Sequence, residues 1–124
     1  MPRAAPRGSD DVSDRLPAHL EAGAIMRLAE TEGGFATVLA RGERDAGTIL
    51  LVTLCRGRDA ILYERMPQLD GSRKFLAVKR EDPENPQEFS EYLARRRRQD
   101  SDMWLIEVDI ADRERFVARL DELS

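Results

Sequence analysis

The chain has 124 residues, 41% of them hydrophobic, so it has room for one domain with a single core and not for a second domain. A formal net charge of −4 argues against general electrostatic binding to nucleic acid, although 35% charged residues allow a local basic patch. No apolar run approaches the roughly 20 residues that cross a bilayer, and the amino end lacks the apolar segment of a secretory signal. We therefore expect a cytoplasmic protein without membrane contact.

The amino end differs in composition from the rest of the chain. Met1 to Asp14 is rich in Pro, Arg, Ser and Asp and contains one isolated Val. Such a segment cannot bury enough apolar surface to offset the entropy of ordering. We predict a disordered tail over residues 1–14 and a single α+β domain over residues 15–124.

The domain is predicted to begin with a helix and two strands. Apolar residues recur at helical spacing over Ala22 to Glu32, and two glycines follow. Phe35 to Ala40 is expected to be a short strand. Thr48 to Cys55 is the most apolar segment of the chain and shows almost no alternation, which is typical of a strand covered on both faces. This segment is expected to lie at the centre of the sheet.

Two more strands are predicted after short connections. The turn Arg56 to Asp59 leads into a strand that contains Ile61 to Tyr63. A longer loop, Pro67 to Ser72, precedes a strand over Lys74 to Lys79. Because four consecutive strands with short links pair most simply as neighbours, the sheet should be mainly antiparallel.

The second half of the domain is predicted to add two helices around a fifth strand. A helix begins after the N-cap residue Asn85, has Pro86 at its first position and runs to about Arg98. Met103 to Ile110 alternates apolar and polar residues as a strand does, and Asp112 to Leu123 has helical spacing. The predicted fold class is α+β: a mainly antiparallel sheet of about five strands with about three helices, mostly on one face.

Trp104 is expected to be a core residue. It lies on the apolar side of the last predicted strand, and a large aromatic side chain there should be buried between the sheet and a helix. Its expected neighbours are Leu51, Phe89, Ile106, Val108 and Phe116.

Two segments carry a resemblance to a known family. They are GGFATVLARGERDAGTILLV, with the turn from Gly42 to Gly47, and PQEFSEYLARRRRQDSDMWLIEVDI, with Asp102 and Trp104 at the start of the last strand. Over nearly everything after Arg15 the chain is similar to a family of short alphaproteobacterial proteins, domain of unknown function 1491. The resemblance implies a bacterial cytosolic protein with a compact α+β fold. It implies no activity, cofactor or catalytic residue.

Residues for soft-metal or nucleophilic chemistry are scarce. His19 and Cys55 are the only His and Cys, so one subunit cannot supply the ligands of a zinc site. No nucleophile motif accompanies His19, and Cys55 lies in the most apolar strand, where a buried structural thiol is expected. We predict no cofactor.

Two carboxylates form the candidate site for acid–base or hard-metal chemistry. Glu107 and Asp109 would lie about 7 Å apart on one side of the last strand. With a third oxygen ligand such as Glu64, they could hold Mg²⁺. The favoured alternative is a solvated strand face whose carboxylates pair with Arg or Lys across the sheet.

The run of four arginines that ends the second predicted helix is the most specific feature. Arg96 falls in the middle of the apolar stripe of that helix, so its guanidinium needs a carboxylate or a path to water. We predict that Glu107 or Asp109 holds Arg96 in a structural ion pair. The other three arginines are expected to be free to meet a partner: Arg95, Arg97 and Arg98.

A basic patch is the sharper interpretation of this run. In this interpretation RNA, DNA or a phosphorylated ligand binds where these residues converge: Arg73, Lys74, Lys79, Arg80 and Arg95 to Arg98. The candidate binding residues among them are Lys79, Arg80, Arg95, Arg97 and Arg98. The favoured alternative is that cations complement the negative end of the helix dipole. An aromatic platform for bases is missing, since Phe75 and Tyr92 are expected in the core.

We therefore expect a small cytosolic binding or assembly protein without catalytic activity. Its partner would be another protein or a second copy of the chain, because sheet edges need covering and two-fold dimers are common. Two alternatives stay open. One is a nucleic-acid or phosphate-ligand binding module that uses the patch around Arg95 to Arg98, and the other is a small Mg²⁺-dependent hydrolase that uses the strand carboxylates.

Overall fold

The computed structural model of the protein describes residues 16–123, so the tail predicted over residues 1–14 lies outside the described residues. The described elements follow in the order α2 (Ala18–Thr31), β1 (Phe35–Ala40), β2 (Ile49–Cys55), β3 (Arg58–Pro67), β4 (Arg73–Arg80), α3 (Pro86–Gln99), β5 (Trp104–Asp109) and α4 (Arg113–Glu122). None of these helices is long and apolar enough to span a membrane.

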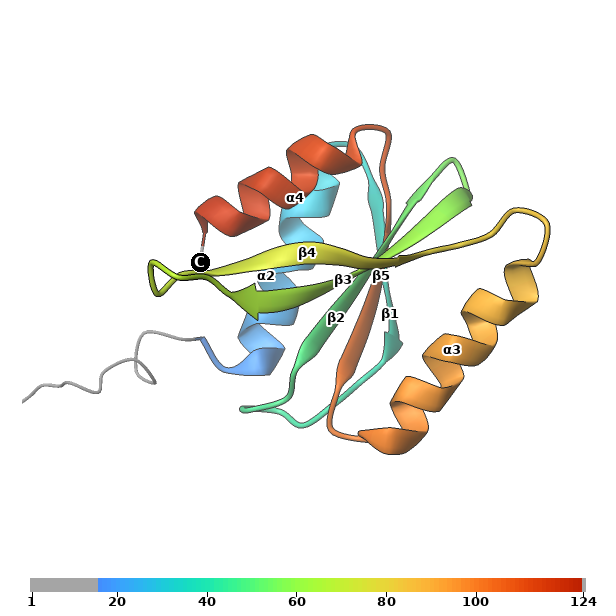
Figure 1. Ribbon diagram of the computed structural model, residues 1–124. Coiled ribbons are helices and arrows are strands. Elements are labelled where there is room, and N and C mark those ends of the chain that lie inside the picture. The colour runs from blue at the N-terminus through green and yellow to red at the C-terminus, as the bar shows by residue number, and fades with distance from the viewer. Residues whose placement is uncertain (1–15, 124) are drawn as a thin grey trace, which may run out of the picture.

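The five strands form one sheet in the order β1-β5-β2-β3-β4 (Figure 1). β5 pairs antiparallel with β1 and parallel with β2, and the other neighbouring strands are antiparallel. The crossover from β4 through α3 inserts β5 between the first two strands of the chain. The predicted fold class is confirmed, with β2 at the centre, where Ile49 to Thr53 are all buried.

The helices cover both faces of the sheet. α2 and α4 lie on one face and α3 lies on the other (Figure 1). Side chains of α2 and α4 share one core cluster with alternate residues of the strands, including Leu51, Tyr63 and Ile106. Phe89 of α3 belongs to a second cluster with Leu50 and their neighbours on the opposite face. Two of the three helices in residues 16–123 therefore lie on one face.

Trp104 is buried, as predicted, with only 3% of its surface exposed. It packs in the cluster of α2 and α4 with Leu51 and Phe116. Phe89 was predicted to be a neighbour, and this is wrong because α3 covers the opposite face of the sheet. Successive side chains of a strand point to opposite faces of the sheet, so the sheet itself lies between the two clusters.

The turn from Gly42 to Gly47 and the segment around Asp102 form one unit. The Trp104 indole N–H donates to the carbonyl oxygen of Glu43 at 2.7 Å, and the Glu43 N–H donates to the carbonyl oxygen of Asp102 at 2.8 Å. A Cβ atom at Gly42 or Gly47 would overlap that same Asp102 oxygen. The two family segments therefore meet where β1 ends and β5 begins.

Candidate functional site

Arg96 of α3 is held by a carboxylate inside the fold. Its Nη1 and Nη2 donate to the two carboxylate oxygens of Glu64 at 2.6 and 3.1 Å, and Nη1 also donates to the Tyr92 hydroxyl at 3.3 Å. These hydrogen bonds raise the pKa of Arg96, so it stays charged. The sequence indicated an internal carboxylate, but the predicted partners, Glu107 and Asp109, are wrong.

The course of α3 explains this correction. The helix begins beside the end of β4 and finishes beside the start of β5, so its last turns lie over the part of the sheet where Glu64 projects. Glu64 pairs in register with Leu50, which packs on the α3 face. Glu107 and Asp109 share that face but lie toward the far end of β5.

Lys79, one of the candidate binding residues, has a structural role on the α3 face. Its Nζ lies 3.0 Å from a carboxylate oxygen of Glu88 and 4.9 Å from the centre of the Tyr92 ring. Arg95 also lies over Tyr92, at 5.7 Å from the ring centre. The Tyr92 ring is therefore flanked by cations of its own chain, so it offers no open platform for a base.

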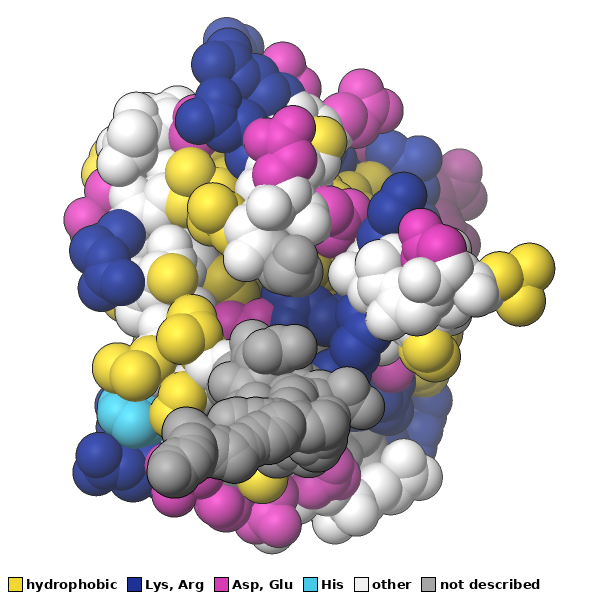
Figure 2. Space-filling model, turned by 90° about the vertical axis from the view of Figure 1, so that its left-hand side faces the viewer, with side chains coloured by type: hydrophobic (Ala, Val, Ile, Leu, Met, Phe, Trp, Pro, Cys, Tyr) yellow, Lys and Arg dark blue, Asp and Glu magenta, His cyan; other side chains and the backbone are white. Residues whose placement is uncertain are grey.

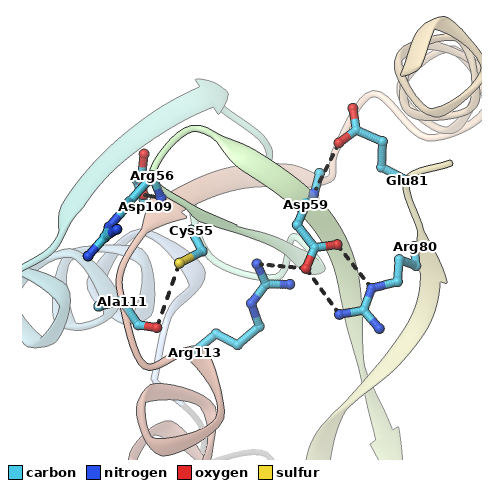
Figure 3. A network of polar contacts seen from close by, with 9 residues as sticks. Cys55, Arg56, Asp59, Arg80, Glu81, Asp109, Ala111 and Arg113 are labelled. Atoms are coloured by element: carbon cyan, nitrogen blue, oxygen red, sulfur yellow. Dashed lines mark hydrogen bonds and ion pairs between the residues drawn. The ribbon is translucent and has the colours of Figure 1, made fainter. Parts of the chain in front are cut away.

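Arg80 projects from the opposite face of the sheet. It pairs in register with Ile61, which packs with α2 and α4, and its guanidinium donates to both carboxylate oxygens of Asp59 at 3.1 and 3.2 Å. Arg113 of α4 approaches the same carboxylate at 3.6 Å (Figure 3). The sheet therefore separates Arg80 from Lys79 and from the arginine run, and the single predicted patch does not form.

Charge is mixed on the side of the molecule that Figure 2 shows. The side that carries α2 and α4 shows Lys and Arg side chains interspersed with Asp and Glu (Figure 2). A broad basic face for a nucleic-acid backbone is not visible there.

A local basic site lies at the carboxyl end of α3. A hollow of about 360 Å³ opens between the last turns of α3, the end of β1 and the loop before β5. Three arginines border it: Arg41, Arg97 and Arg98. The other lining residues are Ala40, Ala94, Asp100, Ser101 and Met103. We call this feature the arginine hollow.

The arginines of the hollow have few internal partners. Arg97 and Arg98 are exposed and form no ion pair within residues 16–123. Arg41 lines the hollow, and its guanidinium lies 5.1 Å from the centre of the Trp104 ring. The carboxylate of Asp100 accepts the backbone N–H of Asp102 at 3.0 Å. A hollow lined by three arginines and one such carboxylate suits an oxyanion, because a guanidinium can bind an oxyanion with paired hydrogen bonds.

Glu107 and Asp109 lie on the same face of the sheet, toward its other end. They pair in register with Thr37 and Phe35 of β1. Burial, and secondly the charge of Asp109, raises the pKa of Glu107. One oxygen of Asp109 accepts the backbone N–H of Arg56 at 2.8 Å.

The proposed third magnesium ligand is engaged elsewhere. Glu64 binds Arg96 through both carboxylate oxygens. Over residues 16–123, no group of three or more His, Cys, Asp or Glu side chains could hold a metal ion. The carboxylate arrangement that the hydrolase alternative requires is therefore not found in this part of the chain.

His19 and Cys55 lie apart from the hollow. The Nδ1 atom of His19 lies 3.2 Å from the carbonyl oxygen of Arg44, on the exposed start of α2. Cys55 is half-buried instead of buried, and its thiol donates to the carbonyl oxygen of Ala111 at 3.8 Å (Figure 3). Neither contact pairs a nucleophile with a base.

Sequence reasoning identified Arg97 and Arg98 and missed Arg41. The missed arginine lies more than fifty residues before the others, so no local pattern joins them. Arg41 directly precedes Gly42, and the turn that begins at Gly42 docks on the segment around Asp102. This position is the one signal in the sequence that could have placed Arg41 near the end of α3. Recognising that docking from sequence would require knowledge of the strand order.

The fold and the hollow define a small α+β domain with an arginine-lined surface site. The chain belongs to the family described as protein of unknown function (DUF1491), whose sequence pattern matches residues 16–118. The family resemblance of the two segments is thereby confirmed.

Solved structures of bacterial proteins have the same fold. A crystal structure of a DUF1491 family protein from Caulobacter crescentus CB15 is 29% identical with a TM-score of 0.70, and covers 82% of this chain and 94% of its own. An NMR structure of a DUF1491 family protein from the same organism is 30% identical with a TM-score of 0.67, and the match covers 82% of this chain and 92% of that protein. The solution structure of protein Atu0922 from A. tumefaciens is 29% identical, with a TM-score of 0.64 and coverages of 79% and 88%. A search of curated proteins gave no match.

Proposed function

We propose that this domain is a non-catalytic cytoplasmic binding module that takes an acidic group of a protein partner into the arginine hollow. The proposal rests on one observation. Arginines from two separate segments, Arg41 after β1 and Arg97 with Arg98 in α3, line one hollow without a carboxylate ion pair in the described part of the chain.

The other candidate cations support this choice by contrast. Lys79 pairs with Glu88, Arg80 with Asp59 and Arg96 with Glu64, so these three charges are used within the fold. A basic group with an internal carboxylate partner contributes less to an external anion, because binding would have to compete with that pair. Among residues 16–123, no carboxylate forms such an ion pair with the charges at the hollow.

A protein partner is favoured over nucleic acid. Single-stranded nucleic acid binds through bases stacked on aromatic rings, and Phe75 is buried while Tyr92 is flanked by cations. The exposed Phe35 lies at the opposite end of β1 from the hollow. The chain also carries a net charge of −4, which opposes a polyanion at long range. A carboxylate on a protein surface needs only the local guanidinium groups.

The test is a binding measurement with a fluorescently labelled poly-glutamate peptide at low protein concentration. The parent chain should raise the anisotropy of the peptide, and Arg97→Glu with Arg98→Glu should abolish the effect. Arg97→Glu alone should weaken binding, and Arg95→Glu is its matched control, because it reverses one charge on the same helix outside the hollow. It should retain most of the binding.

Two results would overturn the proposal. One is an absence of binding by the parent chain, and the other is equal loss of binding in the Arg95 control. A single-stranded RNA of similar charge serves as the second probe. Tighter binding of RNA than of poly-glutamate through Arg97 and Arg98 would replace the protein partner by a nucleic acid.

A further inference from the structure

The two edges of the sheet differ in how they resist pairing with another strand. Edge strand β4 reads RKFLAVKR, with two basic residues at each end, whereas edge strand β1 reads FATVLA and carries no charge. Charged side chains on an edge discourage pairing with a second strand. β1 is therefore the open edge, and it exposes 79% of Phe35 and 41% of Leu39.

Opposite charges lie at the two ends of β1. Ala40, at its carboxyl end, lines the arginine hollow. At its amino end, Phe35 and Thr37 pair in register with Asp109 and Glu107, which we call the acidic pair. Glu107 has no ion pair or hydrogen bond of its carboxylate with any residue between 16 and 123.

Both charged features lie on the α3 face of the sheet. Phe35 and Thr37 share this face with the acidic pair, because residues opposite each other in register point to the same side. Leu105, two residues before Glu107, packs there with Ala40 and Phe89. The basic and acidic groups therefore share one face of the sheet and lie near opposite ends of β1.

A two-fold axis makes these charges self-complementary. When two β1 strands pair antiparallel, the amino end of each strand lies beside the carboxyl end of the other, and both α3 helices stay on one side of the joined sheet. The acidic pair of each copy then faces the arginine hollow of the other copy. The contact occurs twice in the dimer.

We propose that the partner of the arginine hollow is a second copy of this chain, joined through β1 so that each acidic pair meets the other copy's hollow. This rests on the proposed function, because it names the partner of the same site. Strand pairing covers Phe35 and the free edge, and the charges fix the direction and register of the strands. A guanidinium from the second copy also supplies the counter-ion that Glu107 lacks.

Sedimentation equilibrium of the full chain at micromolar concentration and above tests the proposal. The parent should have twice the mass of one 14.1 kDa chain. The hollow variant, Arg97→Glu with Arg98→Glu, should be monomeric, because its hollow repels the acidic pair of a second copy. The variant Glu107→Lys should be weakened in the same way, because its lysine faces arginines.

Mixing the two variants gives the most specific result. In a mixed dimer, the acidic hollow of one chain meets the lysine that replaces Glu107 in the other chain, and the second contact keeps its original opposite charges. The mixture should therefore form dimers that neither variant forms alone. A mixture that stays monomeric overturns the proposal if each variant keeps the parent's thermal unfolding.

Phe35→Lys decides the question if Glu107→Lys does not fold. This exposed edge residue can be changed without disturbing the core, and a lysine there should make the chain monomeric. A dimer that survives Phe35→Lys lies on another surface and overturns the proposal. A parent chain that is monomeric throughout also overturns self-pairing, and the proposed function still stands if that chain binds poly-glutamate through Arg97 and Arg98.

Discussion

Arg96 of α3 and Glu64 of β3 are joined by two hydrogen bonds, of 2.6 and 3.1 Å, that fasten the helix across the sheet. About a quarter of each side chain is exposed, at 27% for Arg96 and 22% for Glu64. This ion pair gives Arg96 a different role from that of its neighbours in the arginine run. One arginine stabilises the fold, and Arg97 and Arg98 face solvent at the hollow.

Arg96→Ala should lower the stability of the domain by roughly 2 kcal/mol, because it removes charged hydrogen bonds and leaves Glu64 half-buried without its partner. Arg96→Lys should lie between parent and alanine variant, since an ammonium group cannot form both bonds in the same plane. Urea unfolding measures both. Arg95→Ala is the control. If it lowers the stability as much as Arg96→Ala does, the structural role assigned to Arg96 is contradicted.

Gly42→Ala should destabilise the domain by about 1 to 3 kcal/mol, the usual cost of overpacking. The added Cβ would overlap the Asp102 carbonyl oxygen, so the turn must move away from the start of β5. This shift should also lengthen the Trp104 hydrogen bond to Glu43 and change tryptophan fluorescence. Thermal unfolding and emission spectra test both effects.

Gly23→Ala is the matched control for that change. It lies within α2, and the nearest atom to an added Cβ is the mobile end of Arg27 at 3.3 Å. Alanine in a helix is favoured over glycine by about 0.5 to 1 kcal/mol, so this variant should be as stable as the parent or more so. Equal losses at both positions would show that close approach at Gly42 is not the cause.

Glu107→Gln should make the monomer more stable at neutral pH. Burial raises the pKa of Glu107 above its ordinary value of 4.5, so the folded chain binds this proton more tightly than the unfolded chain does. The free energy of unfolding therefore falls as pH rises from 4.5 through the folded pKa, and glutamine removes that loss. The advantage of the variant should disappear as pH falls below this range.

Melting temperatures of parent and variant across a pH series, at a dilution where both are monomeric, measure this difference. Glu84→Gln, in the exposed loop before α3, is the control and should show no comparable pH-dependent advantage. If Glu107→Gln gives the same difference at every pH, then the ionised Glu107 carboxylate is not the destabilising group.

The local elements were predictable because their signals are local. The unbroken apolar run of β2 indicated a strand covered on both faces, and Asn85 with Pro86 marked the start of α3. The position of β5 was not predictable in this way. Its alternation indicated a strand, but its insertion between β1 and β2 depends on how α3 crosses the sheet.

The errors at the candidate site have this same origin. Spacing along α3 showed that Arg96 needs an internal partner, but the choice between Glu64 and Glu107 depends on where the helix ends over the sheet. Lys79 and Arg80 are adjacent in sequence and project from opposite faces of β4. Arg41 joins Arg97 only because the turn that begins at Gly42 docks beside the carboxyl end of α3.

The most direct measurement of the central claim is the NMR signal of each arginine side-chain Nε–H during titration with poly-glutamate, made on the monomeric Phe35→Lys variant, in which no second copy fills the hollow. The signals of Arg41, Arg97 and Arg98 should move together and saturate, because all three border one hollow. Those of Arg95 and Arg96 should stay in place, since one lies outside the hollow and the other is bound to Glu64. Equal shifts for all five arginines, or none at the three of the hollow, would contradict an anion site there.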